Sequence, residues 1–122
     1  MSMSKQKIFE KVVTHLIKQG VRSVNDYNVC MYRGPYGNKC AVGCLIPDKM
    51  YSAKMEGNNI FGLISEFKNI LPKYIIDNKE FLMTLQDLHD EKNNWNKNGL
   101  KSYVIEGFTK RHNLSIDFLK GI

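Results

Sequence analysis

Apolar residues recur at the three- and four-residue spacing of an α-helix through most of this 122-residue chain. The pattern is strongest in residues 4–19, where Gly20 follows as a C-terminal cap. The helix-spaced positions there are Ile8, Phe9, Val12, Val13, Leu16 and Ile17. Residues 59–71 and 78–91 repeat the pattern, and Pro72 ends the first of these two segments. The sequence therefore predicts a mainly α-helical protein.

Polar residues stand where the later helices are predicted to begin. Asn58 or Asn59 would cap one helix and Asn78 the next, because a short polar side chain can accept hydrogen bonds from the first turn. A further helix is supported by Leu100, Tyr103, Val104 and Phe108. Ser115 would cap a final turn, and the asparagine-rich segment 93–99 is predicted to be a loop.

Residues 28–46 break the helical pattern. Residues 29–32 are strand-like, residues 34–38 are dense in turn-forming types, and residues 40–46 are small and apolar. A β-hairpin and a loop that leads into a short buried helix both fit this composition. We therefore predict a single compact domain over residues 1–122, mainly α, with a small β-hairpin or irregular element after the first helix.

Composition excludes several protein classes. Hydrophobic residues make up 43% and charged residues 25% of the chain, which excludes a low-complexity or disordered protein. No apolar run approaches the roughly 20 residues that cross a bilayer. The first residues show no hydrophobic leader, so we expect a soluble intracellular protein with no membrane association.

The net charge of +6 is unevenly distributed. Residues 1–22 carry five bases and one acid, and residues 92–122 carry six bases and two acids. Residues 77–91, between them, carry five acids and one lysine. Nucleic-acid binding is possible but not favoured, because the lysines are scattered and only three of the eighteen bases are arginine.

The cysteines predict neither a disulfide nor a metal site. Cys30, Cys40 and Cys44 form an odd set without a C-x-x-C spacing, which is typical of reduced thiols in a cytosol. A zinc site would need all three thiols and a distant histidine from His15, His89 or His112. We therefore expect no metal and no cofactor.

Polar residues with binding potential are concentrated in residues 32–57. Arg33 could meet an anion, and Tyr32 or Tyr36 could stack on a ring. The structural alternative is a tight turn in which Arg33 pairs with Asp48 or Glu56.

A second candidate stretch, residues 85–90, contains His89 at the edge of a buried helix face. Gln86 lies three residues earlier and projects to the same region, whereas the adjacent Asp90 is expected to diverge from the imidazole. A histidine that hydrogen-bonds to a loop is the simpler interpretation. The alternative is a Cys–His enzyme with Cys40 as nucleophile, His89 as general base, and Asp48 or Gln86 orienting the base.

The two stretches together resemble the motifs of a family of small uncharacterised bacteriophage proteins. The first motif is Cys-Ala-Val-Gly…Ile-Pro-Asp at 40–48, and the second is Leu-Gln-x-x-His-Asp at 85–90. The resemblance spans roughly residues 30–112 and implies a phage origin and action in the cytoplasm of the infected host. It brings no activity with it. The polar residues that it singles out are Arg33, Cys40, Asp48, Tyr51, Glu56, Gln86, His89 and Asp90.

The leading hypothesis is a phage accessory protein that binds a host protein or a small host molecule, for example as an inhibitor of a defence system. Its predicted ligand site comprises Tyr32, Arg33, Asp48, Tyr51, Glu56, Gln86, His89 and Asp90. The alternatives are a hydrolase or transferase with Cys40 and His89 as catalytic residues, and a nucleic-acid-binding protein that uses the basic terminal helices. The oligomeric state is left open.

Overall fold

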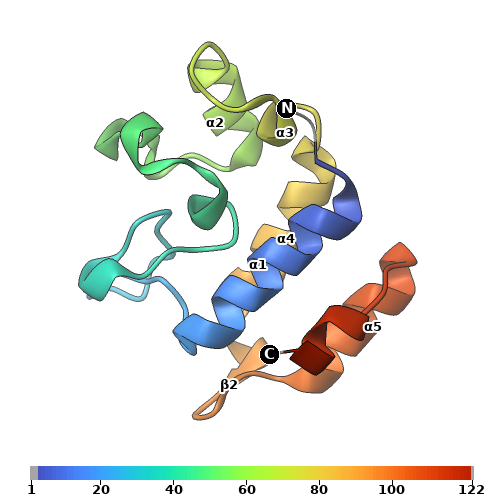
Figure 1. Ribbon diagram of the computed structural model, residues 1–122. Helices are drawn as coiled ribbons and strands as arrows, with labels where there is room; N and C mark the ends of the chain where they lie inside the picture. The colour runs from blue at the N-terminus through green and yellow to red at the C-terminus, as the bar shows by residue number, and fades with distance from the viewer. Residues whose placement is uncertain (1–2, 122) are drawn as a thin grey trace.

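Five α-helices form the framework of the described part of the chain (Figure 1). The computed structural model describes residues 3–121. The helices are α1 (Lys5–Gln19), α2 (Ile60–Phe67), α3 (Lys73–Ile76), α4 (Lys79–Asp90) and α5 (Ser102–His112). In Figure 1, α4 lies behind α1, with α2 and α3 near one end of this pair and α5 beside α1. The prediction of a mainly α-helical domain is confirmed. None of the helices in residues 3–121 has both the length and the apolar content needed to cross a membrane.

Helix α1 begins and ends as its sequence predicts. The Ser4 Oγ atom accepts a hydrogen bond from the backbone N–H of Lys7 at 3.1 Å, which satisfies a donor in the first turn. Gly20 follows with φ of 78°, and its N–H donates to the carbonyl oxygen of Leu16. The fully buried face of α1 consists of Ile8, Phe9, Val12, Val13 and Leu16.

The next helices differ from the prediction at their ends. Asn59 caps α2 by accepting a hydrogen bond from the Gly62 N–H at 2.9 Å, as predicted, but α2 already ends at Phe67. Asn78 precedes α4, yet its side chain does not cap that helix. The Asn78 amide instead donates to the carbonyl oxygen of Tyr74 at 2.8 Å, which ties α4 to the end of α3.

Two structures were predicted for the segment after α1, a β-hairpin and an irregular element. The structure shows the irregular element. It is built from four 3-10 turns at Pro35–Gly37, Gly43–Leu45, Asp48–Met50 and Ala53–Met55. Isolated bridges join Val24 to Cys30 and Arg33 to Lys39, and within residues 3–121 no longer ladder forms in this segment. Small residues allow the chain to pack tightly here, since a Cβ atom at Gly43 would lie 2.0 Å from the carbonyl oxygen of Tyr32.

A β-hairpin forms elsewhere, in the segment that was predicted to be a loop. Strand β1 (Trp95–Asn96) pairs antiparallel with strand β2 (Gly99–Leu100). The Asn96 side chain accepts a hydrogen bond from the N–H of Asn98 at 2.8 Å, and Gly99 adopts φ of 112°. These two features close the turn between such short strands.

One hydrophobic core joins the helices to the irregular segment. The core receives apolar side chains from α1, α2, α3, α4 and α5. The irregular segment contributes Cys40, Ala41, Val42, Leu45 and Ile46, all nearly inaccessible to solvent. Phe9 of α1 stacks on Phe108 of α5 with ring centroids 5.5 Å apart. The irregular segment is therefore held in place by burial against α1 and α4 rather than by a sheet.

Candidate functional site

The two motif-bearing stretches, far apart in the sequence, meet in the structure. The side chain of Gln86 on α4 accepts a hydrogen bond from the backbone N–H of Val42 at 3.0 Å. The same amide donates to Asp90 Oδ1 at 2.9 Å, one helical turn further along. Gln86 therefore links the cysteine-containing segment to the carboxylate at the end of α4.

A pocket of about 430 Å³ lies beside Gln86, and none of residues 40–48 is among its lining residues. Helix α4 contributes Met83, Gln86, Asp87 and Asp90, which the helical repeat places on one face. The remaining lining residues come from segments 29–32 and 56–60. Of the residues predicted to bind a ligand, the pocket contains Tyr32, Glu56, Gln86 and Asp90.

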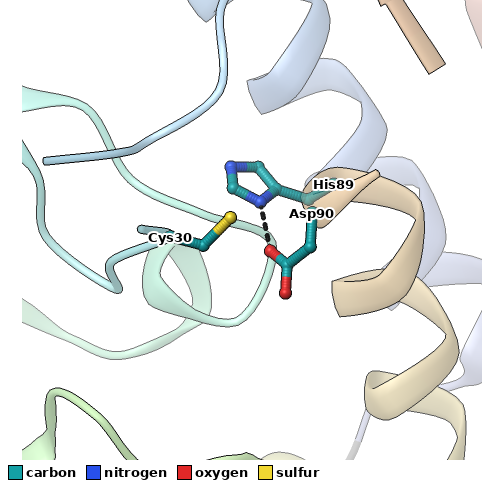
Figure 2. Close-up of side chains that lie close together, drawn as sticks. All are labelled: Cys30, His89 and Asp90. Atoms are coloured by element: carbon teal, nitrogen blue, oxygen red, sulfur yellow. Dashed lines mark hydrogen bonds and ion pairs between the residues drawn. The ribbon is translucent and has the colours of Figure 1, made fainter. Parts of the chain in front are cut away.

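His89 and Asp90 form a hydrogen-bonded pair at the edge of this pocket (Figure 2). His89 is fully buried, and its Nε2 atom accepts a hydrogen bond from the backbone N–H of Ser23 at 2.9 Å. Because a backbone N–H can only donate, Nε2 is unprotonated and the ring proton lies on Nδ1. That Nδ1–H donates to Asp90 Oδ1 at 2.7 Å.

The expectation that the Asp90 side chain diverges from the imidazole is therefore wrong. Asp90 is the last residue of α4, and Gln86 donates to the same Oδ1 atom that receives the His89 proton. These two donors turn the carboxylate back toward the imidazole. The other oxygen of Asp90 points away from the ring in Figure 2.

Cys30 completes this group, although nothing in the sequence singled it out. Its Sγ atom, one ring nitrogen of His89 and one carboxylate oxygen of Asp90 all lie within 4.8 Å of one another. Arg22 Nη1 lies 3.8 Å from this sulfur and donates to the Asp90 carbonyl oxygen at 3.1 Å. Burial and the neighbouring Asp90 carboxylate raise the pKa of the Cys30 thiol to about 11, so the thiol is protonated at neutral pH.

Glu56 lines the pocket and also holds the irregular segment together. Its carboxylate accepts hydrogen bonds from the backbone N–H groups of Tyr32 at 2.9 Å and Arg33 at 3.0 Å. The Tyr51 hydroxyl donates to the same carboxylate at 2.5 Å. Burial and this bond to Glu56 raise the pKa of Tyr51 to about 12. Burial also raises the pKa of Tyr32, whose hydroxyl donates to the Asn58 carbonyl oxygen at 2.6 Å.

Arg33 lies outside the pocket and is engaged within its own segment. Its Nη1 atom pairs with Asp48 Oδ1 at 2.8 Å, its Nη2 atom donates to the Ile46 carbonyl oxygen at 2.6 Å, and the guanidinium packs over the Tyr51 ring. The internal pair predicted as the alternative to anion binding is therefore present. Hydrogen bonds from Lys39 and Arg33 hold the pKa of the exposed Asp48 carboxyl below its usual value. Of the predicted ligand residues, Arg33, Asp48, Tyr51 and the fully buried His89 do not line the pocket.

The proposed catalytic pair of Cys40 and His89 lacks the contact that it needs. Cys40 is 0% exposed, its sulfur accepts a hydrogen bond from the Gly43 N–H at 3.3 Å, and burial raises the pKa of its thiol to about 12. Both ring nitrogens of His89 are already bonded, to Ser23 and to Asp90. Over residues 3–121 no hydrogen bond joins Cys40 to His89, so the geometry gives the nucleophile–base hypothesis no support.

Alkylation rates of the folded protein test this arrangement. We expect iodoacetamide at about pH 8 to modify Cys30 first and Cys40 last, because Cys30 lines an open pocket whereas Cys40 is sealed in the core. Peptide mass spectrometry identifies the modified thiol, and all three cysteines should react in guanidinium chloride. Preferential modification of Cys40 would contradict the burial described here and restore it as a candidate nucleophile.

The three thiols do not come together as a zinc-binding set. The metal-capable group in residues 3–121 contains a single cysteine, Cys30, together with His89 and Asp90. Cys40 and Cys44 are free thiols outside this group.

No protein-family model, no curated protein and no solved structure matches this chain. The resemblance to bacteriophage proteins therefore remains a prediction, and the case for function depends on the geometry of the pocket. That geometry consists of a concave surface, a carboxylate oriented by His89 and Gln86, and a partly exposed thiol.

Proposed function

We propose that this chain is a small bacteriophage-type accessory protein that acts in the host cytoplasm by binding a host protein or a small host molecule. The observation that carries the proposal is a preformed pocket lined by Gln86 and Asp90 of residues 85–90, where the Gln86 side chain also binds the Val42 N–H of residues 40–48. The resemblance to phage proteins singled out these same two stretches. A function of this kind includes inhibition of a host defence system.

The pocket combines apolar walls with polar groups of fixed orientation, as ligand sites commonly do. Val29, Met31, Ile60 and Met83 supply the apolar surface. Asp90 is oriented by two donors, and Asp87 and Glu56 add two further carboxyl groups. No lysine or arginine is among the lining residues that the structure describes. The pocket therefore favours a ligand that brings hydrogen-bond donors or positive charge.

Binding is better supported than a reaction that depends on Cys40, because that thiol is buried and its pKa is raised. It is also better supported than nucleic-acid binding at this pocket, because Glu56, Asp87 and Asp90 line it and would repel phosphate groups.

Filling the mouth of the pocket tests the proposal. Met83→Arg places a long cationic side chain at a pocket-lining position that is 37% exposed, four residues before Asp87 on the same helix face. Ile70→Arg makes the same chemical change at a site that is 47% exposed and does not line the pocket. Both variants should keep the wild-type thermal midpoint to within a few degrees, because both positions are solvent-exposed.

The binding readout uses affinity purification and native mass spectrometry after incubation with a bacterial host extract. We expect wild-type protein and Ile70→Arg to retain the same bound protein or small molecule, and Met83→Arg to lose at least about tenfold of it. A partner that both variants retain equally would place the binding surface outside this pocket. A partner that both variants lose equally would also contradict binding in this pocket, because Ile70 does not line it.

A further inference from the structure

We propose that Cys30, His89 and Asp90 form a binding site for one zinc ion at the edge of the pocket. Their donor atoms are a sulfur, a ring nitrogen and a carboxylate oxygen, all within 4.8 Å of one another (Figure 2). Around a tetrahedral zinc ion such donors lie about 3.3–3.8 Å apart. His89 Nδ1 and Asp90 Oδ1, now 2.7 Å apart, would separate slightly around the ion, while no donor pair in the group has to close from more than 4.8 Å.

The mixture of donors selects the metal. One thiolate, one imidazole and one carboxylate suit a borderline ion such as Zn²⁺, whereas Mg²⁺ and Ca²⁺ prefer oxygen-only sites. Three protein ligands leave the fourth zinc position free, as in catalytic zinc sites. Cys30 and Asp90 both line the 430 Å³ pocket, so that free position faces the space available to a ligand.

Supporting groups for two of the ligands are already in place. Gln86 donates to Asp90 Oδ1 and thereby orients the carboxylate, a role typical of residues behind a metal ligand. Arg22 stands 3.8 Å from the Cys30 sulfur, where its positive charge favours the thiolate that zinc requires and opposes the incoming dication. The carboxyl groups of Asp87 and Glu56 line the same pocket and offset that opposition.

Zinc binding requires two proton movements. The Cys30 thiol, protonated at neutral pH because its pKa is about 11, releases its proton to solvent. The proton on His89 Nδ1 must also leave, and Nε2 takes one up from solvent, so that the ring changes tautomer without changing charge. The dication with one thiolate and one carboxylate is then neutral overall.

Ser23 is the residue that must accommodate the new tautomer. Its backbone N–H now donates to Nε2 and cannot do so once Nε2 carries a proton. Its hydroxyl oxygen, however, is buried and has no hydrogen-bond partner among the described residues. A small shift of Ser23 would let this hydroxyl accept the Nε2–H, so zinc binding would give a hydrogen-bond partner to a buried polar atom that has none among the described residues.

Spectroscopic titration of the 122-residue chain, freed of metal by a chelator, tests the site, with Co²⁺ and Zn²⁺ alone as probes. We expect one equivalent of Co²⁺ to give thiolate-to-cobalt charge-transfer absorption and tetrahedral d–d bands, and Zn²⁺ to displace it. Zinc binding should release about one proton at neutral pH. It should also move the His89 ring proton to Nε2, as read from the imidazole ¹⁵N shifts.

Three variants assign the ligands. Cys30→Ser should remove the charge-transfer band and weaken Zn²⁺ binding at least about hundredfold, and Asp90→Asn should weaken it at least about tenfold. Cys44→Ser is the matched control, because it removes another partly buried thiol outside the group, and it should bind Zn²⁺ as the wild type does. Far-UV circular dichroism confirms that each variant is folded before titration.

The proposal is overturned if folded wild-type protein binds Zn²⁺ no more tightly than millimolar. It is equally overturned if Cys30→Ser and Asp90→Asn leave the affinity unchanged, or if Cys44→Ser removes the charge-transfer band. The zinc site does not rest on the proposed function. If zinc does not bind, the comparison of Met83→Arg with Ile70→Arg still tests the proposed function. If the pocket binds no ligand, the metal titration still tests the zinc site.

Discussion

Gly43→Ala is expected to destabilise the folded protein by about 3 kcal/mol or more, because the added methyl group has no space. A Cβ atom at Gly43 would lie 2.0 Å from the carbonyl oxygen of Tyr32 and 3.0 Å from its Cα atom. These are backbone atoms and cannot rotate away as a side chain could. Gly43 is also buried, so relief requires that the turn at Gly43–Leu45 move away from the Tyr32 backbone.

Urea unfolding of Gly43→Ala and Gly107→Ala measures this effect against a control. In the middle of α5, a Cβ atom at Gly107 would meet only the end of the flexible Arg111 side chain, at 3.4 Å. Because alanine favours a helix over glycine, Gly107→Ala should be neutral or stabilise by up to about 1 kcal/mol. Equal unfolding free energies for the two variants would show that Gly43 does not pack against the Tyr32 backbone.

His89→Ala is expected to destabilise the protein by about 4 kcal/mol, the sum of two effects. The first is the cavity left by a fully buried side chain whose ring packs edge-on against Trp95 at 6.0 Å. The second is the loss of the acceptor for the buried Ser23 N–H and of a donor to Asp90. A destabilisation of this size would show that the His89 side chain stabilises the fold.

His89→Gln separates these two effects. Its side-chain oxygen can replace Nε2 as acceptor for the Ser23 N–H, so we expect it to recover about 1–2 kcal/mol relative to alanine. Urea unfolding measures both variants. A glutamine variant no more stable than the alanine variant would mean that the Ser23 bond contributes nothing. A cost below about 1 kcal/mol for alanine would contradict the burial of His89.

The helices were predictable because their signals are local. The apolar residues of α1 lie on one face, and its two ends are set by Ser4 and Gly20, within a few residues of the groups that they cap. Where a helix end depends on another element, the prediction was less accurate. Asn78 is an example, because its side chain bonds to Tyr74 instead of to the first turn of α4.

The sequence predicted several residues of the candidate site but not the contacts that these residues make. Tyr32, Glu56, Gln86 and Asp90 were predicted and line the pocket, whereas Arg33, Asp48, Tyr51 and His89 were predicted and do not. The distinction depends on which neighbour each side chain finds. Arg33 meets Asp48 within its own segment, and this leaves it unavailable to the pocket.

The partners of His89 show why the remaining contacts needed the folded chain. Cys30, Arg22 and Ser23 lie 59 to 67 residues before it and carry no spacing signal, yet they surround the imidazole and its aspartate. Helical periodicity depends on neighbours three or four residues apart and can be read along the chain. The pocket, the ring tautomer and the thiol beside them depend on how the irregular segment is buried against α4, which no local pattern specifies.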